Sequence, residues 1–114
     1  MLIMELEIMT CVKMITNNKI MTNTEIISKL NVLLADYQIY YQNLRGFHWN
    51  IQGKLFFELH AKFEELYTDS AVKIDEVAER ILTIEGLPLH TFEDYVASST
   101  IPVTKNVHDG ETAV

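Results

Sequence analysis

Two long segments with a helical spacing of apolar residues constrain the fold of this chain more than any other feature. Apolar side chains recur every three or four positions in residues 26–51 and again in residues 55–84, which is the period of an amphipathic helix. Gly53 separates the two segments in a position typical of a helix C-terminus. We therefore expect an all-α protein with helices over about residues 23–51 and 54–85, paired as an antiparallel hairpin.

Local signals support these boundaries. Thr22 and Glu25 match a capping box, in which each side chain bonds the other residue's backbone N–H at the start of a helix. Gly86 and Pro88 follow the second segment in the order that commonly ends helices. Gly46 lies inside the first segment, where glycine costs about 1 kcal/mol relative to alanine. We therefore expect a close approach of another element to the backbone at Gly46.

Shorter elements are expected after the second long helix. Residues 91–97 predict a short helix with Thr91 at its N-cap, and the serines and threonine that follow it indicate a linker. Asp109 predicts the start of a further helix at about residue 109. Residues 22–114 are therefore expected to belong to one helical domain.

The first 21 residues differ in composition from the rest of the chain. All five methionines lie there, without any glycine, proline or aromatic residue. Glu5 and Glu7 interrupt the apolar residues, so the segment does not match a signal peptide. We expect residues 1–21 to be a disordered tail, or to precede a natural start at Met21.

Composition excludes several classes of protein. The 114 residues suit one domain, and no apolar run approaches the ~20 residues of a membrane span. The net charge of −7 argues against general affinity for nucleic acid. Cys11 is the single cysteine, which excludes an intramolecular disulfide and is typical of a reducing, cytoplasmic compartment.

Candidate metal ligands are concentrated in the second long helix. His60 and Glu64 are four residues apart and share a face, and Asp75 and Glu79 repeat this spacing. The helical repeat turns both pairs roughly the same way but separates them by ~22 Å. A metal with bonds of ~2.0–2.2 Å cannot contact both pairs of one chain.

A second copy of the chain resolves this separation. A two-fold axis near Asp69 and Ser70 would bring His60 and Glu64 of one copy opposite Asp75 and Glu79 of the other, giving two equivalent sites. The antiparallel hairpin adds His48, which precedes Gly53 by about as much as His60 follows it. The complete predicted site takes residues from two subunits: His48, His60 and Glu64 from one, with Asp75 and Glu79 from its two-fold partner.

Imidazoles mixed with carboxylates suit iron better than magnesium, and zinc is a chemically possible substitute. Each feature also has a simpler interpretation when taken alone. A pair of polar residues four apart is usually a solvated helix face. His48 alone is more typical of a buried core histidine, and Trp49 either shields an oxidising site or anchors the core. The metal site is favoured only because both pairs of polar residues lie on one face of the helix and a single two-fold axis would bring them together.

A family resemblance rests on the stretch LNVLLADYQIYYQNLRGFHWNIQGKLFFELHAKFEELYTDSAVKIDEVAERI. It resembles the first half of the Dps family, the DNA-binding proteins from starved cells within the ferritin-like superfamily. The motif HWN, a histidine twelve residues later and DEVAER carry the resemblance, which covers roughly residues 24–100. It implies that His48, His60, Asp75 and Glu79 match the family's inter-subunit ferroxidase ligands. Glu64 stands where many members have Asp and is expected to be a ligand or near-ligand.

The resemblance implies a partial ferritin-like domain: a hairpin and a short crossover helix, without the third and fourth long helices (C and D) of the bundle. It further implies a dodecamer that oxidises Fe(II), with hydrogen peroxide as the typical oxidant, and stores ferric iron against oxidative damage. We expect activity here only if another chain supplies the missing half-bundle.

Two further expectations concern partners. DNA binding in the family often uses basic tails, but Lys13 and Lys19 are offset by Glu5 and Glu7, which argues against DNA binding here. The alternative to a ferroxidase is a non-enzymatic helical hairpin, either a truncated fragment or a module that binds other subunits through its apolar faces.

Overall fold

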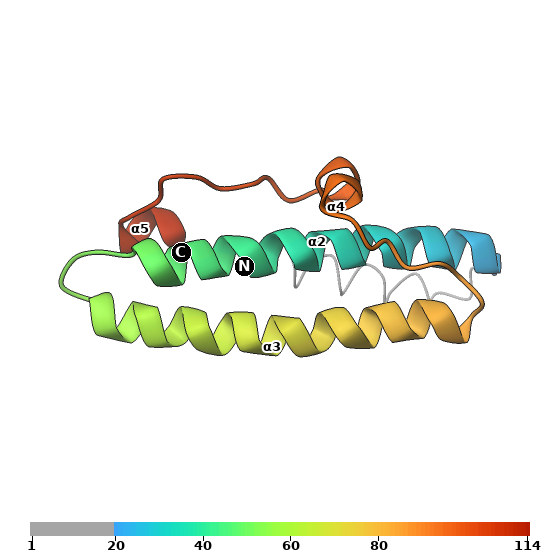
Figure 1. The fold of residues 1–114 in the computed structure, drawn as a ribbon, viewed down its shortest axis with the longest axis horizontal. Coiled ribbons are helices and arrows are strands. Elements are labelled where there is room, and N and C mark those ends of the chain that lie inside the picture. Colours follow the sequence, from blue (N-terminus) through green and yellow to red (C-terminus); the bar gives the residue numbers. More distant parts are fainter. Residues whose placement is uncertain (1–19) are drawn as a thin grey trace.

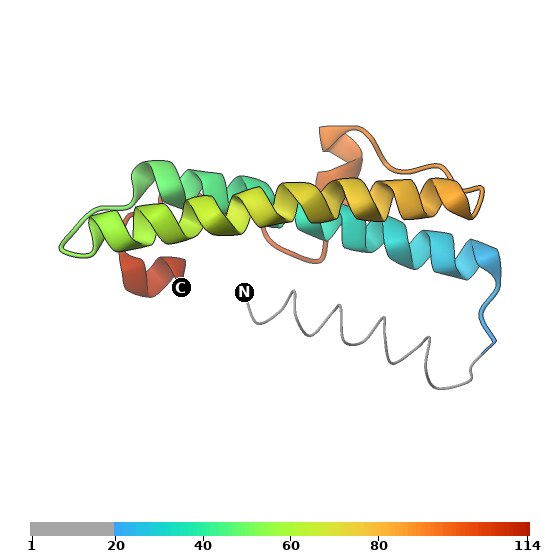
Figure 2. The same ribbon diagram turned by 90° about the horizontal axis from the view of Figure 1, so that it is seen from below.

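The protein is an antiparallel pair of long helices with a crossover segment laid along one of them (Figure 1). The computed structural model describes residues 20–114. Helices α2 (Asn23–Asn50) and α3 (Phe56–Thr83) form the hairpin, and the short helices α4 (Phe92–Ser98) and α5 (Gly110–Ala113) follow. Figures 1 and 2 place α4 beside α2 rather than on the outer side of α3. The described elements are all helices, which confirms the predicted all-α hairpin.

The start of α2 has the predicted capping box. The Glu25 backbone N–H donates to Thr22 Oγ1 over 3.2 Å, and the Thr22 N–H donates to the Glu25 carboxylate over 3.0 Å. Upstream, most of the expected tail of residues 1–21 and the whole environment of Cys11 lie outside the described residues. Within residues 20–114, no helix combines the length and apolar character that crossing a bilayer requires.

The end of α3 differs in detail from the sequence expectation. The left-handed position after the helix is taken by Glu85, with φ of 64°, and not by Gly86. The Gly86 N–H donates to the Ile81 carbonyl over 2.9 Å, which closes a Schellman motif. Gly86 is required for space, since a Cβ there would lie 2.8 Å from side-chain atoms of Ile27 and Ile81.

The expectation that another element closely approaches the backbone at Gly46 is wrong. Gly46 lies within α2, and a Cβ built on it meets no other atom within 4 Å. At the hairpin turn, by contrast, Gly53 has a φ of 106°, a conformation that L residues rarely adopt. The helix C-cap is Ile51, so Gly53 serves the turn two residues beyond the cap.

One cluster of buried apolar residues lies at the turn end of the hairpin, and other buried residues such as Leu34 and Ile81 lie further from the turn. Leu44, Ile51 and Phe63 are at most 2 % exposed and form one cluster. The rings of Phe47 and Phe63 lie 5.5 Å apart across the two helices, and Leu59 packs against the same cluster. Close packing here fixes the spacing of α2 and α3 where the predicted histidines lie.

Polar side chains of α2 hold the crossover segment in place. Asp36 is fully buried and accepts hydrogen bonds from Ser99 Oγ (2.8 Å), the Thr100 N–H (2.6 Å) and Thr100 Oγ1 (2.9 Å). Asn31 and Asn43 each bond one backbone carbonyl and one backbone N–H of the same crossover, on either side of Asp36. The crossover is therefore tied to α2 by side chains rather than by a ladder of backbone bonds.

Candidate metal centre

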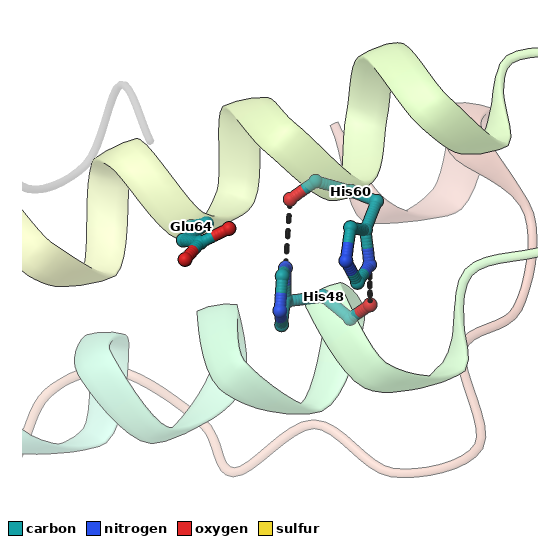
Figure 3. A group of neighbouring side chains, drawn as sticks. All are labelled: His48, His60 and Glu64. Carbon is teal, nitrogen blue, oxygen red and sulfur yellow. Dashed lines mark hydrogen bonds between the residues drawn. The ribbon is translucent and has the colours of Figure 1, made fainter.

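Two histidines face each other across the hairpin, close to its turn (Figure 3). His48 lies in the last turn of α2 and is 7 % exposed, and His60 lies on α3 opposite it. Their rings stack with centroids 3.7 Å apart and an angle of 21° between the planes. The His48 Nδ1 is 2.7 Å from the His60 backbone oxygen, and the His60 Nδ1 is 2.8 Å from the His48 backbone oxygen.

These reciprocal bonds assign a role to each ring nitrogen. A carbonyl oxygen only accepts, so each Nδ1 must carry the hydrogen and donate. In the neutral ring the lone pair then resides on Nε2, the atom that remains available to a cation. His60 also supplies a donor to one of the last four carbonyls of α2, which have no partner within their own helix. The pair thus orients two nitrogen ligands and joins the two helices.

Glu64 adds a carboxylate one turn further along α3. It is exposed, and Figure 3 shows its side chain beside the two imidazoles. Ligand atoms of His48, His60 and Glu64 all lie within 4.8 Å of one another. Atoms bound at ~2.1 Å on opposite sides of a metal are about 4 Å apart, so the spacing of the three ligand atoms is close to what one shared cation requires.

Aromatic rings surround the histidine pair. Phe56 stacks on His60 with centroids 5.1 Å apart, and Tyr67 presents an edge to His48 at 5.3 Å. These contacts restrict the rotation of the two imidazoles. The centre therefore has aromatic rings beside its imidazoles and an exposed carboxylate toward solvent.

Asp75 and Glu79 lie elsewhere on the same helix. Both are exposed, and both belong to the half of α3 beyond Ser70. The rise of an α-helix separates Glu64 from Asp75 by ~16 Å. The structure thus brings together three of the five predicted ligands, and within one chain it leaves the other two apart from them.

Trp49 lies at the surface of the hairpin and packs against Arg45. Its side chain is 57 % exposed, and its ring lies under the Arg45 guanidinium at 4.8 Å. Arg45 also lies 5.2 Å from the Tyr41 ring, so it is held between two aromatic side chains. A shielding role for Trp49 stays a prediction.

Sequence reasoning missed Phe56 and Tyr67 as neighbours of the centre. Both fit the apolar period of the second helix, so they were indistinguishable from ordinary core residues. Phe56 precedes His60 by four residues, which is the one signal that could have placed its ring on the imidazole.

The chain is similar to proteins of known family. The model of the ferritin-like domain matches residues 27–114. DNA protection during starvation protein 2 of Bacillus anthracis is 47 % identical over 91 residues, which are 80 % of this chain and 60 % of that protein. DNA protection during starvation protein of Porphyromonas gingivalis is 52 % identical over 71 residues, covering 62 % of this chain and 45 % of the relative. The chain thus spans about half the length of the curated relatives it matches.

Solved structures give the same picture. The crystal structure of a Dps protein from Vibrio cholerae, described as a member of a superfamily of ferritin-like diiron-carboxylate proteins, superposes with a TM-score of 0.76 at 52 % identity. The match covers 80 % of this chain and 58 % of that one. A Dps structure from Listeria innocua, soaked with zinc, has a TM-score of 0.72 at 28 % identity, covering 76 % and 59 % of the two chains.

Proposed function

The chain belongs to the Dps family of ferritin-like proteins, and from that premise we propose that it binds Fe(II) as a substrate and takes part in its oxidation. The observation that carries the proposal is the reciprocal hydrogen bonding of His48 and His60. It leaves both Nε2 atoms free to bind a cation. One ligand atom of each imidazole and of Glu64 lies within 4.8 Å of the others. Two imidazoles with a carboxylate are a donor set that suits iron, and zinc would compete for it.

We place the remaining ligands on a second copy of the chain. Asp75 and Glu79 are exposed and cannot reach the histidines of their own chain, whereas an antiparallel α3 of a partner would bring them there. Three carboxylates and two imidazoles would then surround the iron. The same arrangement would repeat by symmetry, giving two centres for each pair of chains.

Hydrogen peroxide is the oxidant that fits this chemistry. One peroxide would accept two electrons, one from each of two Fe(II) ions, and two protons from solvent, giving two Fe(III) ions and two waters without release of a hydroxyl radical. The oxidation would consume both reagents that generate hydroxyl radicals, which is a protective role. We propose that this protection operates in the cytoplasm and, given the net charge of −7, without DNA binding by this chain.

The site assignment is tested by substituting one ligand from each half. His60→Ala combined with Asp75→Ala should lower Fe(II) affinity and peroxide-dependent oxidation at least tenfold. His90→Ala combined with Glu76→Gln is the matched control, because these exposed residues carry similar groups outside the centre. Unchanged oxidation in the first double variant would show that the assignment is wrong.

Mixing single variants tests whether two chains share each centre. In a mixed pair, His60→Ala in one chain and Asp75→Ala in the other leave one centre with both changes and one intact. A statistical mixture should therefore recover about a quarter of the wild-type centres, as two-fold symmetry requires. No recovery would indicate a centre made within one chain. If the wild-type chain itself does not oxidise Fe(II), the non-enzymatic hairpin is favoured.

A further inference from the structure

One exposed stripe runs along α3 beside the face that packs on α2. Its members are separated by seven, four, three, four and seven residues, spacings close to whole turns of a helix. All six are exposed in the structure: Phe57, Glu64, Thr68, Ala71, Asp75 and Leu82. Phe57 is 80 % exposed and Leu82 59 % exposed, so both leave apolar surface in contact with water in the single chain.

The stripe has the same order of residue types from either end. An apolar residue is followed by a carboxylate, a small residue, a second small residue, a carboxylate and an apolar residue. Its midpoint falls between Asp69 and Ser70, the position of the two-fold axis in the proposed metal centre. An antiparallel copy centred there places Phe57 opposite Leu82, at the same register that places Glu64 opposite Asp75.

We infer that Phe57 and Leu82 form an apolar clasp at each end of a two-fold α3–α3 interface with a second copy of this chain. The clasp rests on the two-chain centre proposed above. Its contacts would select a second copy of the chain as the partner and fix the register of the two α3 helices. Because the interface is isologous, each pair of chains contains the clasp twice. Thr68 and Ala71 at the middle are small enough to allow the two helix backbones to approach closely.

The acidic residues of the stripe explain why the clasp is needed. Glu64 faces Asp75 of the second copy, and like charges repel when no cation lies between them. The middle of the stripe therefore cannot hold two metal-free chains together. The apolar ends can do so, because burying Phe57 and Leu82 removes both side chains from water. A cation that then enters between the carboxylates would strengthen a pairing that already exists.

Register-specific cross-linking tests the clasp. In a Cys11→Ser background, Phe57→Cys chains and Leu82→Cys chains are mixed in EDTA and oxidised with diamide. We expect a disulfide-linked dimer from the mixture and none from either chain alone. In one chain these positions are ~37 Å apart along the helix, so the bond can form only between chains. Phe57→Cys mixed with Val72→Cys is the control, because Val72 is 56 % exposed on the same helix but ~15 Å from the required register. Equal yields in both mixtures would overturn the proposal.

Charged substitutions test the strength of the clasp separately from the metal centre. Phe57→Glu and Leu82→Lys should each weaken metal-free self-association at least tenfold in sedimentation, and the double variant should recover most of it through an ion pair between chains. Val103→Glu, at a residue 63 % exposed on the crossover, should leave association unchanged. His60→Ala should lose Fe(II) binding and keep the cross-link, so a failure of the site and a failure of the clasp give different results. Single variants that associate like the wild type would contradict the clasp.

Discussion

A histidine that donates from Nδ1 to a backbone carbonyl has only Nε2 left for a cation. His48 and His60 both meet this condition, each through the carbonyl of the other. A metal centre thus gains its ligand orientation from main-chain groups, which are present whatever the neighbouring side chains are. Sequence spacing could predict that the two histidines lie at similar heights in the hairpin. It could not predict the reciprocal bonds, since these depend on the distance between the two helices.

The strongest prediction for a single residue concerns the stabilising role of Asp36. It is fully buried and accepts three hydrogen bonds from Ser99 and Thr100. Asp36→Ala should lower the free energy of unfolding by ~2–4 kcal/mol, because it removes these part-buried bonds and leaves a cavity where a buried side chain packed. Urea denaturation followed by circular dichroism measures the change. The control is Asp69→Ala, which removes only an exposed ion pair with Lys73 and should cost less than ~1 kcal/mol. A similar cost for both variants would contradict the structural role of Asp36.

Two glycines, Gly46 within α2 and Gly86 just beyond the end of α3, lead to opposite predictions. Gly86→Ala should destabilise the protein by ~1–3 kcal/mol, because its Cβ would lie within 3 Å of Ile27 and Ile81 side chains. Gly46→Ala should stabilise it by ~0.5–1 kcal/mol, because the added Cβ meets open space within a helix. Thermal unfolding of both variants beside the wild type measures the difference. A gain at Gly86 or a loss at Gly46 would show that the packing around these glycines differs from that described.

The helices themselves were the most predictable level of the fold. Apolar period and capping residues place α2 and α3 within about two residues of their observed ends, since these signals are local. The side of α2 on which the crossover lies was not predictable, because Asp36 occupies a polar position in the pattern and its partners follow more than sixty residues later. The prediction of a close approach at Gly46 was wrong because it also depended on which element lies beside α2. A glycine within a helix indicates close packing only if another element lies next to it.

At the scale of the whole molecule, the five candidate ligands are distributed unevenly along one hairpin. Three are grouped near the turn, and two lie in the other half of α3. Sequence alone predicted this separation, because the rise of a helix is fixed. Sequence could not predict that α3 would also carry exposed Phe57 and Leu82 at symmetric positions, since exposure depends on which elements cover the helix.

If two chains share each centre, the stabilisation by metal must depend on protein concentration. Zn²⁺, which does not change its oxidation state, should raise the melting temperature, since a cation at a hundred times its Kd adds ~2.7 kcal/mol to a folded state that alone binds it. Differential scanning calorimetry at protein concentrations a hundredfold apart should give a larger rise at the higher one, because pairing completes the centre. His48→Ala should remove the rise at both concentrations. A rise of equal size at both in the wild type would instead mean that His48, His60 and Glu64 of a single chain bind the cation without Asp75 and Glu79 of a partner.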